Sequence, residues 1–162
     1  MKNLEGGLSF AKYMEKSNQD ERNSQIAAYD NTSISEECKK DILNISEPVN
    51  VIIFSAAHCP DCTVTLPYIK KMQELNSNIN AKIYPLKGNE KLLQEYVGQA
   101  RIPTVITFNK DWKPKGAYVE IPKAITEKIS RLPVEMQKKT IEEYRAGKYN
   151  ELIEAELLAL IK

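Results

Sequence analysis

The stretch VIIFSAAHCPDCTVTLP (residues 51–67) joins an apolar run to a helix-forming segment, and it contains the chain's only histidine and two of its three cysteines. The run VNVIIFSAA (49–57) is apolar and rich in β-branched residues, which predicts a fully buried strand. The residues that follow, to about Leu75, carry apolar side chains at helical spacing. Cys59 therefore lies between a buried strand and the first turn of a helix, and Cys62 follows three residues later.

This position favours ionisation of the Cys59 thiol, because the unpaired N–H groups and the positive end of the helix dipole lie at the start of a helix. Only the thiolate attacks a disulfide, and thiols in such positions have pKa values of about 3.5 to 7.5. Cys62 lies one turn further along the helix, where it can attack a mixed disulfide formed at Cys59. The spacing indicates an exposed attacking thiol and a sheltered resolving thiol.

Two other interpretations of the pair remain open. A C-x-x-C can be half of a zinc site, although zinc needs four ligands and only Cys38 and His58 remain as further thiol or imidazole groups. The pair can also be two inert core cysteines. Cys38 itself lies on the apolar side of a predicted helix and is expected to be a small core residue. We predict no metal site.

The composition excludes several classes of protein. The 23 basic and 22 acidic side chains leave a net charge of +1, which gives no reason to expect a nucleic-acid or membrane partner. The first 20 residues lack the apolar core of a signal peptide, and no window approaches 18 uncharged apolar residues. We therefore expect a cytoplasmic protein. Thiols are kept reduced there, and a close cysteine pair is more often catalytic or metal-binding than structural.

We expect one domain over residues 1–162, with a core at 49–121, a helical N-terminal extension at 1–48 and C-terminal helices at 122–162. The order of elements indicates an α/β fold with a mixed sheet. The predicted elements are helices within 8–45, at 61–75 and at 89–100, strands at 49–57, 81–87, 102–108 and 115–121, and helices after Pro122, Pro133 and Gly147.

Two patterns support helices in the N-terminal extension. Ser33 precedes Glu36 by three residues, which is the spacing of a capping box. Two sets of apolar residues recur at helical spacing: Leu8, Phe10, Ala11 and Met14, and then Ile34, Cys38 and Ile42.

Four features in order give the chain a resemblance to the thioredoxin superfamily. They are the strand VIIF, the C-P-D-C motif, Pro67 five residues after Cys62, and the I-P-T sequence at 102–104 that leads a strand. The match covers about residues 49–121, and the helical ends resemble a bacterial branch of the superfamily. The resemblance implies a three-layer α/β/α fold with extra helices at both termini.

The resemblance also implies roles for individual residues. Cys59 takes the place of the nucleophile and Cys62 that of the resolving thiol. Pro103 takes the place of a cis-proline facing the pair, where the backbone at Ile102 and Pro103 docks substrate in extended form. Pro67 is expected to kink the active-site helix.

The chain departs from typical thioredoxins near the pair. Ile53 replaces a buried aspartate thought to assist the resolving cysteine, which puts a role for the nearby Lys82 in doubt. His58 replaces a tryptophan and either favours the thiolate as an imidazolium or is simply exposed. Asp61, between the cysteines, suits a helix N-terminus, but its charge disfavours a second anion nearby. We therefore list His58 and Asp61 as residues that tune the pKa of Cys59.

These observations predict a cytoplasmic thiol–disulfide oxidoreductase without a bound cofactor. Its partners would be a disulfide-containing protein or small-thiol substrate and a reductase or thiol pool that recycles it. The alternative is a thioredoxin-fold module that senses redox state or binds a partner without significant turnover.

Overall fold

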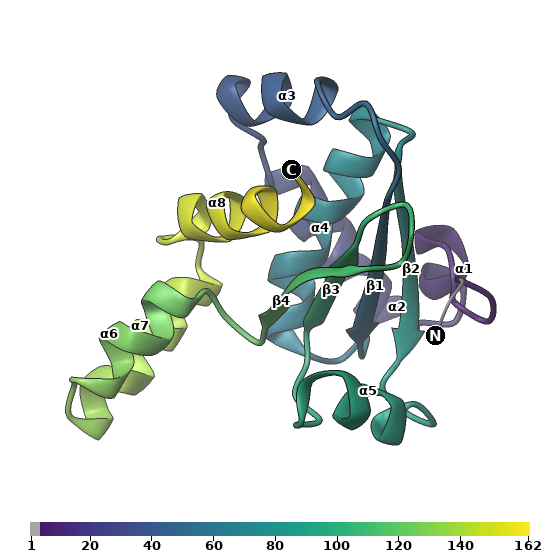
Figure 1. Ribbon diagram of the computed structural model, residues 1–162. Coiled ribbons are helices and arrows are strands. Elements are labelled where there is room, and N and C mark those ends of the chain that lie inside the picture. The colour runs from purple at the N-terminus through teal and green to yellow at the C-terminus, as the bar shows by residue number, and fades with distance from the viewer. Residues whose placement is uncertain (1–3) are drawn as a thin grey trace.

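The computed structural model describes residues 4–162 (Figure 1). Residues 1–3, the start of the predicted N-terminal extension, lie outside the described residues. The described strands are β1 (Val49–Ser55), β2 (Ile79–Pro85), β3 (Thr104–Phe108) and β4 (Pro114–Val119). The described helices are α1 (Phe10–Glu15), α2 (Gln19–Asn31), α3 (Glu36–Leu43), α4 (Pro60–Leu75), α5 (Glu90–Val97), α6 (Lys123–Ser130), α7 (Val134–Arg145) and α8 (Asn150–Ile161).

The four strands form one mixed sheet in the order β2-β1-β3-β4. β1 pairs in parallel with β2 and antiparallel with β3, and β3 pairs antiparallel with β4. Every residue of β1 is buried, as the apolar run predicts for a strand covered on both faces. The mixed sheet expected from the sequence is therefore confirmed.

Helices cover both faces of this sheet, which confirms the three-layer architecture. Alternate residues of a strand point to opposite faces, so Val51 and Ile53 contribute to one core and Ile52 and Phe54 to another. The first core contains side chains from α3, α4 and α8, and the second contains Leu93 of α5. In Figure 1, α5 lies apart from the other helices at the lower end of the sheet.

Prolines and a glycine end or begin several elements where the sequence predicts. Pro85 is the last residue of the edge strand β2, where it is not required to donate a ladder hydrogen bond. Gly98 ends α5 with a φ of +77°, a left-handed conformation that glycine adopts easily. Pro122 and Pro133 precede α6 and α7. The predicted strand at 102–108 begins two residues later, at Thr104.

The N-terminal extension is attached to the sheet by backbone hydrogen bonds. Leu8 and Ile83 exchange two of them, with N···O distances of 2.7 and 2.8 Å, in an isolated antiparallel bridge. Gly7 allows this close approach, because a Cβ atom at that position would lie 2.6 Å from the Cβ atom of Lys82. The bridge fixes the start of α1 beside β2.

Two local predictions for the extension are wrong. Ala11 is exposed, and the side chain of α1 that enters the core is that of Tyr13. The residue that caps α3 is Ser35 rather than Ser33, because the Ser35 hydroxyl accepts the backbone N–H of Cys38 at 3.2 Å. The apolar face of α3 is confirmed, since Ile34, Cys38 and Ile42 are all buried.

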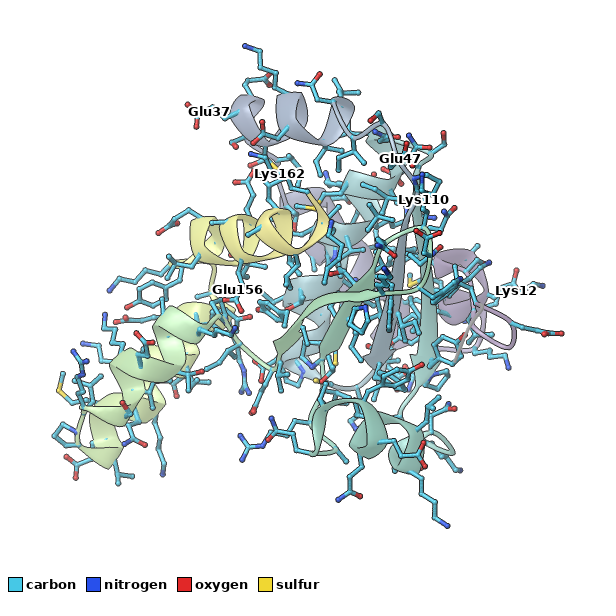
Figure 2. The ribbon with its side chains drawn as sticks, in the orientation of Figure 1. Lys12, Glu37, Glu47, Lys110, Glu156 and Lys162 are labelled. Atoms are coloured by element: carbon cyan, nitrogen blue, oxygen red, sulfur yellow. The ribbon has the colours of Figure 1, made fainter. Side chains whose placement is uncertain are left out.

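The C-terminal helices differ in how they meet the sheet. α8 buries Ile153, Leu157 and Ile161 in the main core, whereas α6 and α7 form a pair that projects away from the sheet (Figure 1) and places only Ile125 and Tyr144 in that core. The surface carries exposed ion pairs such as Lys110–Glu47, 2.7 Å apart (Figure 2), and exposed pairs of this kind contribute little to stability. Among residues 4–162, no helix has both the length and the apolar character needed to cross a membrane.

Candidate active site

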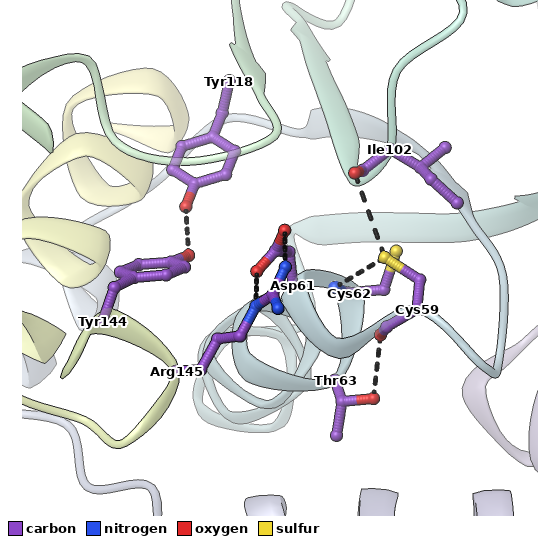
Figure 3. Close-up of polar contacts among 8 residues, drawn as sticks. All are labelled: Cys59, Asp61, Cys62, Thr63, Ile102, Tyr118, Tyr144 and Arg145. Atoms are coloured by element: carbon purple, nitrogen blue, oxygen red, sulfur yellow. Dashed lines mark hydrogen bonds and ion pairs between the residues drawn. The ribbon is translucent and has the colours of Figure 1, made fainter. Parts of the chain in front are cut away.

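Cys59 is the N-cap residue of α4, immediately after the loop that follows β1 (Figure 3). Its backbone is extended, and Pro60 occupies the first turn, where a missing N–H costs nothing. The Cys59 Sγ atom accepts the backbone N–H of Cys62 at 3.2 Å, as a side-chain oxygen does at an ordinary N-cap. The sulfur is therefore held at the positive end of the helix.

The two thiols of the motif differ strongly in burial and acidity. Cys59 is half-buried, whereas Cys62 is 1% exposed. A hydrogen bond from the Cys62 thiol, helped by the Cys62 backbone N–H and opposed by burial, lowers the pKa of Cys59 to about 7. Burial, followed by the adjacent Cys59, raises the pKa of Cys62 well above its ordinary value. Cys59 is the thiol that can ionise near neutral pH.

The backbone before β3 faces the dithiol from across the site. The Ile102–Pro103 peptide bond is cis, as the resemblance implies. The carbonyl oxygen of Ile102 lies 3.9 Å from the Cys59 Sγ atom, and Figure 3 shows that contact beside the hydrogen bond that the backbone N–H of Cys62 donates to the same sulfur. Residues 43 positions apart in the sequence therefore meet at one sulfur.

Asp61 has a partner that sequence reasoning missed. Its carboxylate receives two hydrogen bonds from the Arg145 guanidinium, Nε to Oδ1 at 2.8 Å and Nη2 to Oδ2 at 3.1 Å (Figure 3). Arg145 lies in the last turn of α7, 84 residues away. A two-pronged arginine–carboxylate pair is both directional and strong. The only sequence signal for Arg145 is its positive charge in the last turn of a helix, a position that favours cations.

The pair gives Asp61 a mixed influence on the nucleophile. The negative charge of Asp61 raises the pKa of Cys59, whereas its backbone N–H lowers that pKa. The positive charge of Arg145 is close enough for Cys59 to raise the pKa of Arg145 in turn. The expected opposition between Asp61 and the thiolate is therefore present, and Arg145 offsets part of it.

The side chains at 58 and 53, also expected to lie near the dithiol, differ in exposure. His58 is exposed, which is one of its two expected arrangements. Ile53 is fully buried at the position where typical thioredoxins carry an acid. Two residues further along β1, the fully buried Ser55 has its hydroxyl 2.8 Å from that of Tyr13 in α1. Sequence reasoning did not single out either of these hydroxyl groups.

The remaining cysteine lies apart from the dithiol. Cys38 is buried in α3, and burial raises the pKa of its thiol to about 12. Within residues 4–162, no group of three or more histidine, cysteine, aspartate or glutamate side chains is placed to hold a metal ion.

Comparisons with known proteins agree on the fold. The family model described as thioredoxin matches residues 7–144. A solved structure of a protein of unknown function from Pseudomonas aeruginosa is 20% identical, with a TM-score of 0.81 over 98% of this chain and 93% of that chain. An HIV epitope-scaffold structure is also 20% identical, with a TM-score of 0.82 over 98% and 94%. No curated protein matches the chain.

Proposed function

Because the chain belongs to the thioredoxin family, we propose that it is a thiol–disulfide oxidoreductase that reduces disulfides through Cys59 and Cys62. The observation that carries this proposal is the difference between the two thiols. Cys59 is half-buried, and its pKa is lowered to about 7. Cys62 is buried one helical turn away, and its backbone N–H donates a hydrogen bond to the Cys59 sulfur. Dithiol exchange needs one reactive and one protected sulfur.

The reaction takes two steps. The Cys59 thiolate attacks a substrate disulfide, so one S–S bond forms between Cys59 and the substrate while the substrate bond breaks and releases a thiolate. Cys62 then attacks the Cys59 sulfur, the Cys59–Cys62 disulfide forms, and the second substrate thiol leaves with the proton of Cys62. The substrate gains two electrons and the dithiol loses them, so a reductase or thiol pool must return the protein to the reduced state.

A disulfide-reduction assay with dithiothreitol as the electron donor tests this proposal. We expect Cys59→Ser to abolish turnover, and we expect Cys62→Ser, mixed with substrate in the absence of dithiothreitol, to accumulate the mixed disulfide. Cys38→Ser is the matched control and should retain full turnover, because Cys38 lies in the core of α3 away from the pair. A reversible Cys59–Cys62 disulfide without turnover would instead identify a redox-sensing module.

The pH dependence of alkylation provides an independent test. With the pKa of Cys59 at about 7, its reactivity toward iodoacetamide should rise with pH through a midpoint near 7. Cys62 and Cys38 should stay unmodified in that range, because burial raises the pKa of each thiol. Mass spectrometry of peptides from protein alkylated at several pH values would identify which thiol reacts. A midpoint above 8.5 at Cys59 would contradict the proposed activation.

Of the two substrate classes, a disulfide-containing protein and a small disulfide, we propose the protein, because a hollow near the dithiol could receive it. A hollow beside Arg145 lies between the α6–α7 pair and the segment before β3, and Ile121, Ile129 and Ile141 contribute apolar surface to it. Ile141→Lys should therefore raise KM for a protein disulfide while leaving the reduction of a small disulfide such as oxidised glutathione unchanged. An equal effect on both substrates would exclude the hollow as a docking surface.

A further inference from the structure

Three buried polar side chains from three different elements form a series that ends at Cys62 of the dithiol. The Tyr13 hydroxyl in α1 lies 2.8 Å from the Ser55 Oγ atom at the end of β1. Ser55 also lies close to Cys62 in α4: burial raises the pKa of the Cys62 thiol most, and a hydrogen bond from the Ser55 side chain lowers it. Tyr13 is 5% exposed, Ser55 0% and Cys62 1%, so the series lies inside the main core.

Hydroxyl groups at these positions are costly unless they are used. Burying a hydroxyl without a partner costs about 1–3 kcal/mol in proteins, and alanine and phenylalanine would fill the same space without that risk. Ser55 has one proton to donate. If Tyr13 donates its proton to Ser55, the proton of Ser55 is free to point at Cys62. Once Cys62 is ionised its sulfur can only accept, which makes Ser55 the donor to Cys62 and the acceptor from Tyr13.

Cys62 needs such a donor when it reacts. Burial disfavours its thiolate, which must nevertheless form as it attacks the mixed disulfide. Few neighbouring side chains can stabilise the Cys62 thiolate in this step. Asp61 is paired with Arg145, and Ile53 is apolar. Cys59 is covalently bound to the substrate at that stage. The backbone N–H of Ala56 is a second donor to the Cys62 sulfur. Glu21 of α2 acts only at a distance, on Tyr13.

We propose that Ser55 is a catalytic residue of the second step, in which its hydroxyl donates a hydrogen bond to the Cys62 sulfur as that sulfur becomes a thiolate, and that Tyr13 is the positioning residue that orients it. This inference rests on the proposed function. The proton of Cys62 passes to the leaving substrate thiolate, or to water when that thiolate is a weak base such as the coloured product of 5,5′-dithiobis(2-nitrobenzoate). The N-terminal extension thereby contributes to the reaction through Tyr13.

The two steps can be followed separately with 5,5′-dithiobis(2-nitrobenzoate) in stopped flow. Attack by Cys59 releases the first coloured thiolate, and resolution by Cys62 releases the second. We expect Ser55→Ala to leave the first phase within twofold of the wild type and to slow the second about tenfold, the factor typical of losing a hydrogen bond to an ionised group. The pH midpoint of the second phase should rise by about one unit.

Two further variants separate this role from a structural one. Tyr13→Phe keeps the ring in the core, and it should slow the second phase about threefold without changing the first. Ser55→Thr retains the hydroxyl and should restore the second phase to within about twofold of the wild type. Thermal unfolding of each variant shows whether the fold is retained, and Tyr13→Phe carries the test if Ser55→Ala fails to fold.

The outcomes are distinguishable. An unchanged second phase in both Ser55→Ala and Tyr13→Phe, or a slowing without any shift of the pH midpoint, overturns the inference and leaves the proposed function intact. The absence of any second phase in the wild type, with the same trace in Cys62→Ser, overturns the proposed function and this inference together.

Discussion

The two helical regions that flank the thioredoxin-like core approach the dithiol with different chemistry. The N-terminal region contributes Tyr13, a neutral hydroxyl that reaches the buried Cys62 through Ser55. The C-terminal region contributes Arg145, a full positive charge that reaches the half-buried Cys59 through Asp61. In the proposed reaction, one region thus supports the resolving thiol, and the other supports the nucleophile.

The two regions use different chemistry because Cys59 lies near solvent and Cys62 lies in the core. A charge is costly to bury, whereas a paired hydroxyl is tolerated in the core. The side chain of Arg145 is 42% exposed and that of Asp61 10%, so this ion pair spans the boundary between solvent and core. Tyr13 and Ser55 lie wholly on the inner side of that boundary. Each sulfur therefore has the kind of partner that its surroundings permit.

Removing the guanidinium should have the largest effect. Arg145→Met leaves the Asp61 carboxylate without its partner, and we expect a loss of about 2–3 kcal/mol in the free energy of unfolding, below the usual cost for a fully buried pair because Arg145 is partly solvated. The Cys59 alkylation midpoint should also rise, since the nearby positive charge is lost and the negative one is uncompensated. Urea denaturation and the pH profile of alkylation measure the two effects.

The matched control is Lys148→Met, which removes a cation from an exposed pair with Glu143. That change should lower the free energy of unfolding far less than Arg145→Met does, because exposed pairs contribute little, and it should leave the alkylation midpoint unchanged. Equal effects of the two variants would show that Arg145 is no more than a surface cation.

The N-terminal side can be disturbed through its attachment to the sheet. A Cβ atom at Gly7 would lie 2.6 Å from Lys82 and 2.9 Å from Tyr84, so Gly7→Ala should lower the free energy of unfolding by about 2 kcal/mol. The second phase of the two-step assay should slow more than the first, because α1 and Tyr13 follow this bridge. Gly88→Ala is the control for a general loss of stability: it meets no atom within 4 Å but strains the backbone, because φ at Gly88 is +91°, and it should not slow the second phase more than the first.

A smaller loss of stability is expected from a change at Tyr144, in the last turn of α7. The hydroxyls of Tyr118 and Tyr144 lie 3.1 Å apart in the core (Figure 3), and Tyr144→Phe removes that hydrogen bond. Chemical denaturation should show a loss of about 1 kcal/mol. The Cys59 midpoint should not move. A shifted midpoint would mean that this bond, rather than the ion pair, controls the position of Arg145.

The smallest change is expected from the charge of Asp61 itself. Asp61→Asn removes an anion that raises the pKa of Cys59 and frees the Arg145 charge, so the alkylation midpoint should fall by about half a pH unit. In the double variant with Arg145→Met, the midpoint should lie between those of the two single variants. An unchanged or higher midpoint in Asp61→Asn would contradict the opposition between Asp61 and the thiolate.

Local patterns predicted the centre of the molecule well. The strand before Cys59 and the helix after it follow from apolar runs and spacing within 51–67, whereas the placement of Pro103 opposite the pair was implied by the resemblance to the thioredoxin superfamily. What the sequence did not reveal are contacts between distant segments. Arg145 meets Asp61 across 84 residues, and Tyr13 meets Ser55 across 42. A single serine in an apolar strand and a tyrosine in a short helix carry no periodic signal.

The errors in the N-terminal extension have the same origin. Helical spacing favoured Ala11 over Tyr13 because it ranks residues by apolar character, whereas the bridge at Leu8 decides which side of α1 meets the sheet. The capping prediction chose Ser33 over Ser35 because Ser33 matches a motif, although both serines precede the helix within three residues. Tertiary attachment, rather than propensity, determined the outcome in the first case.

The bridge between Leu8 and Ile83 also bears on self-association. An unpaired outer strand is a template on which a second molecule can add a strand of its own. In this protein the chain itself occupies that position at the centre of β2, and Pro85 offers no donor at its end. The N-terminal segment thus obstructs the addition of a further strand at the β2 edge, as well as anchoring α1.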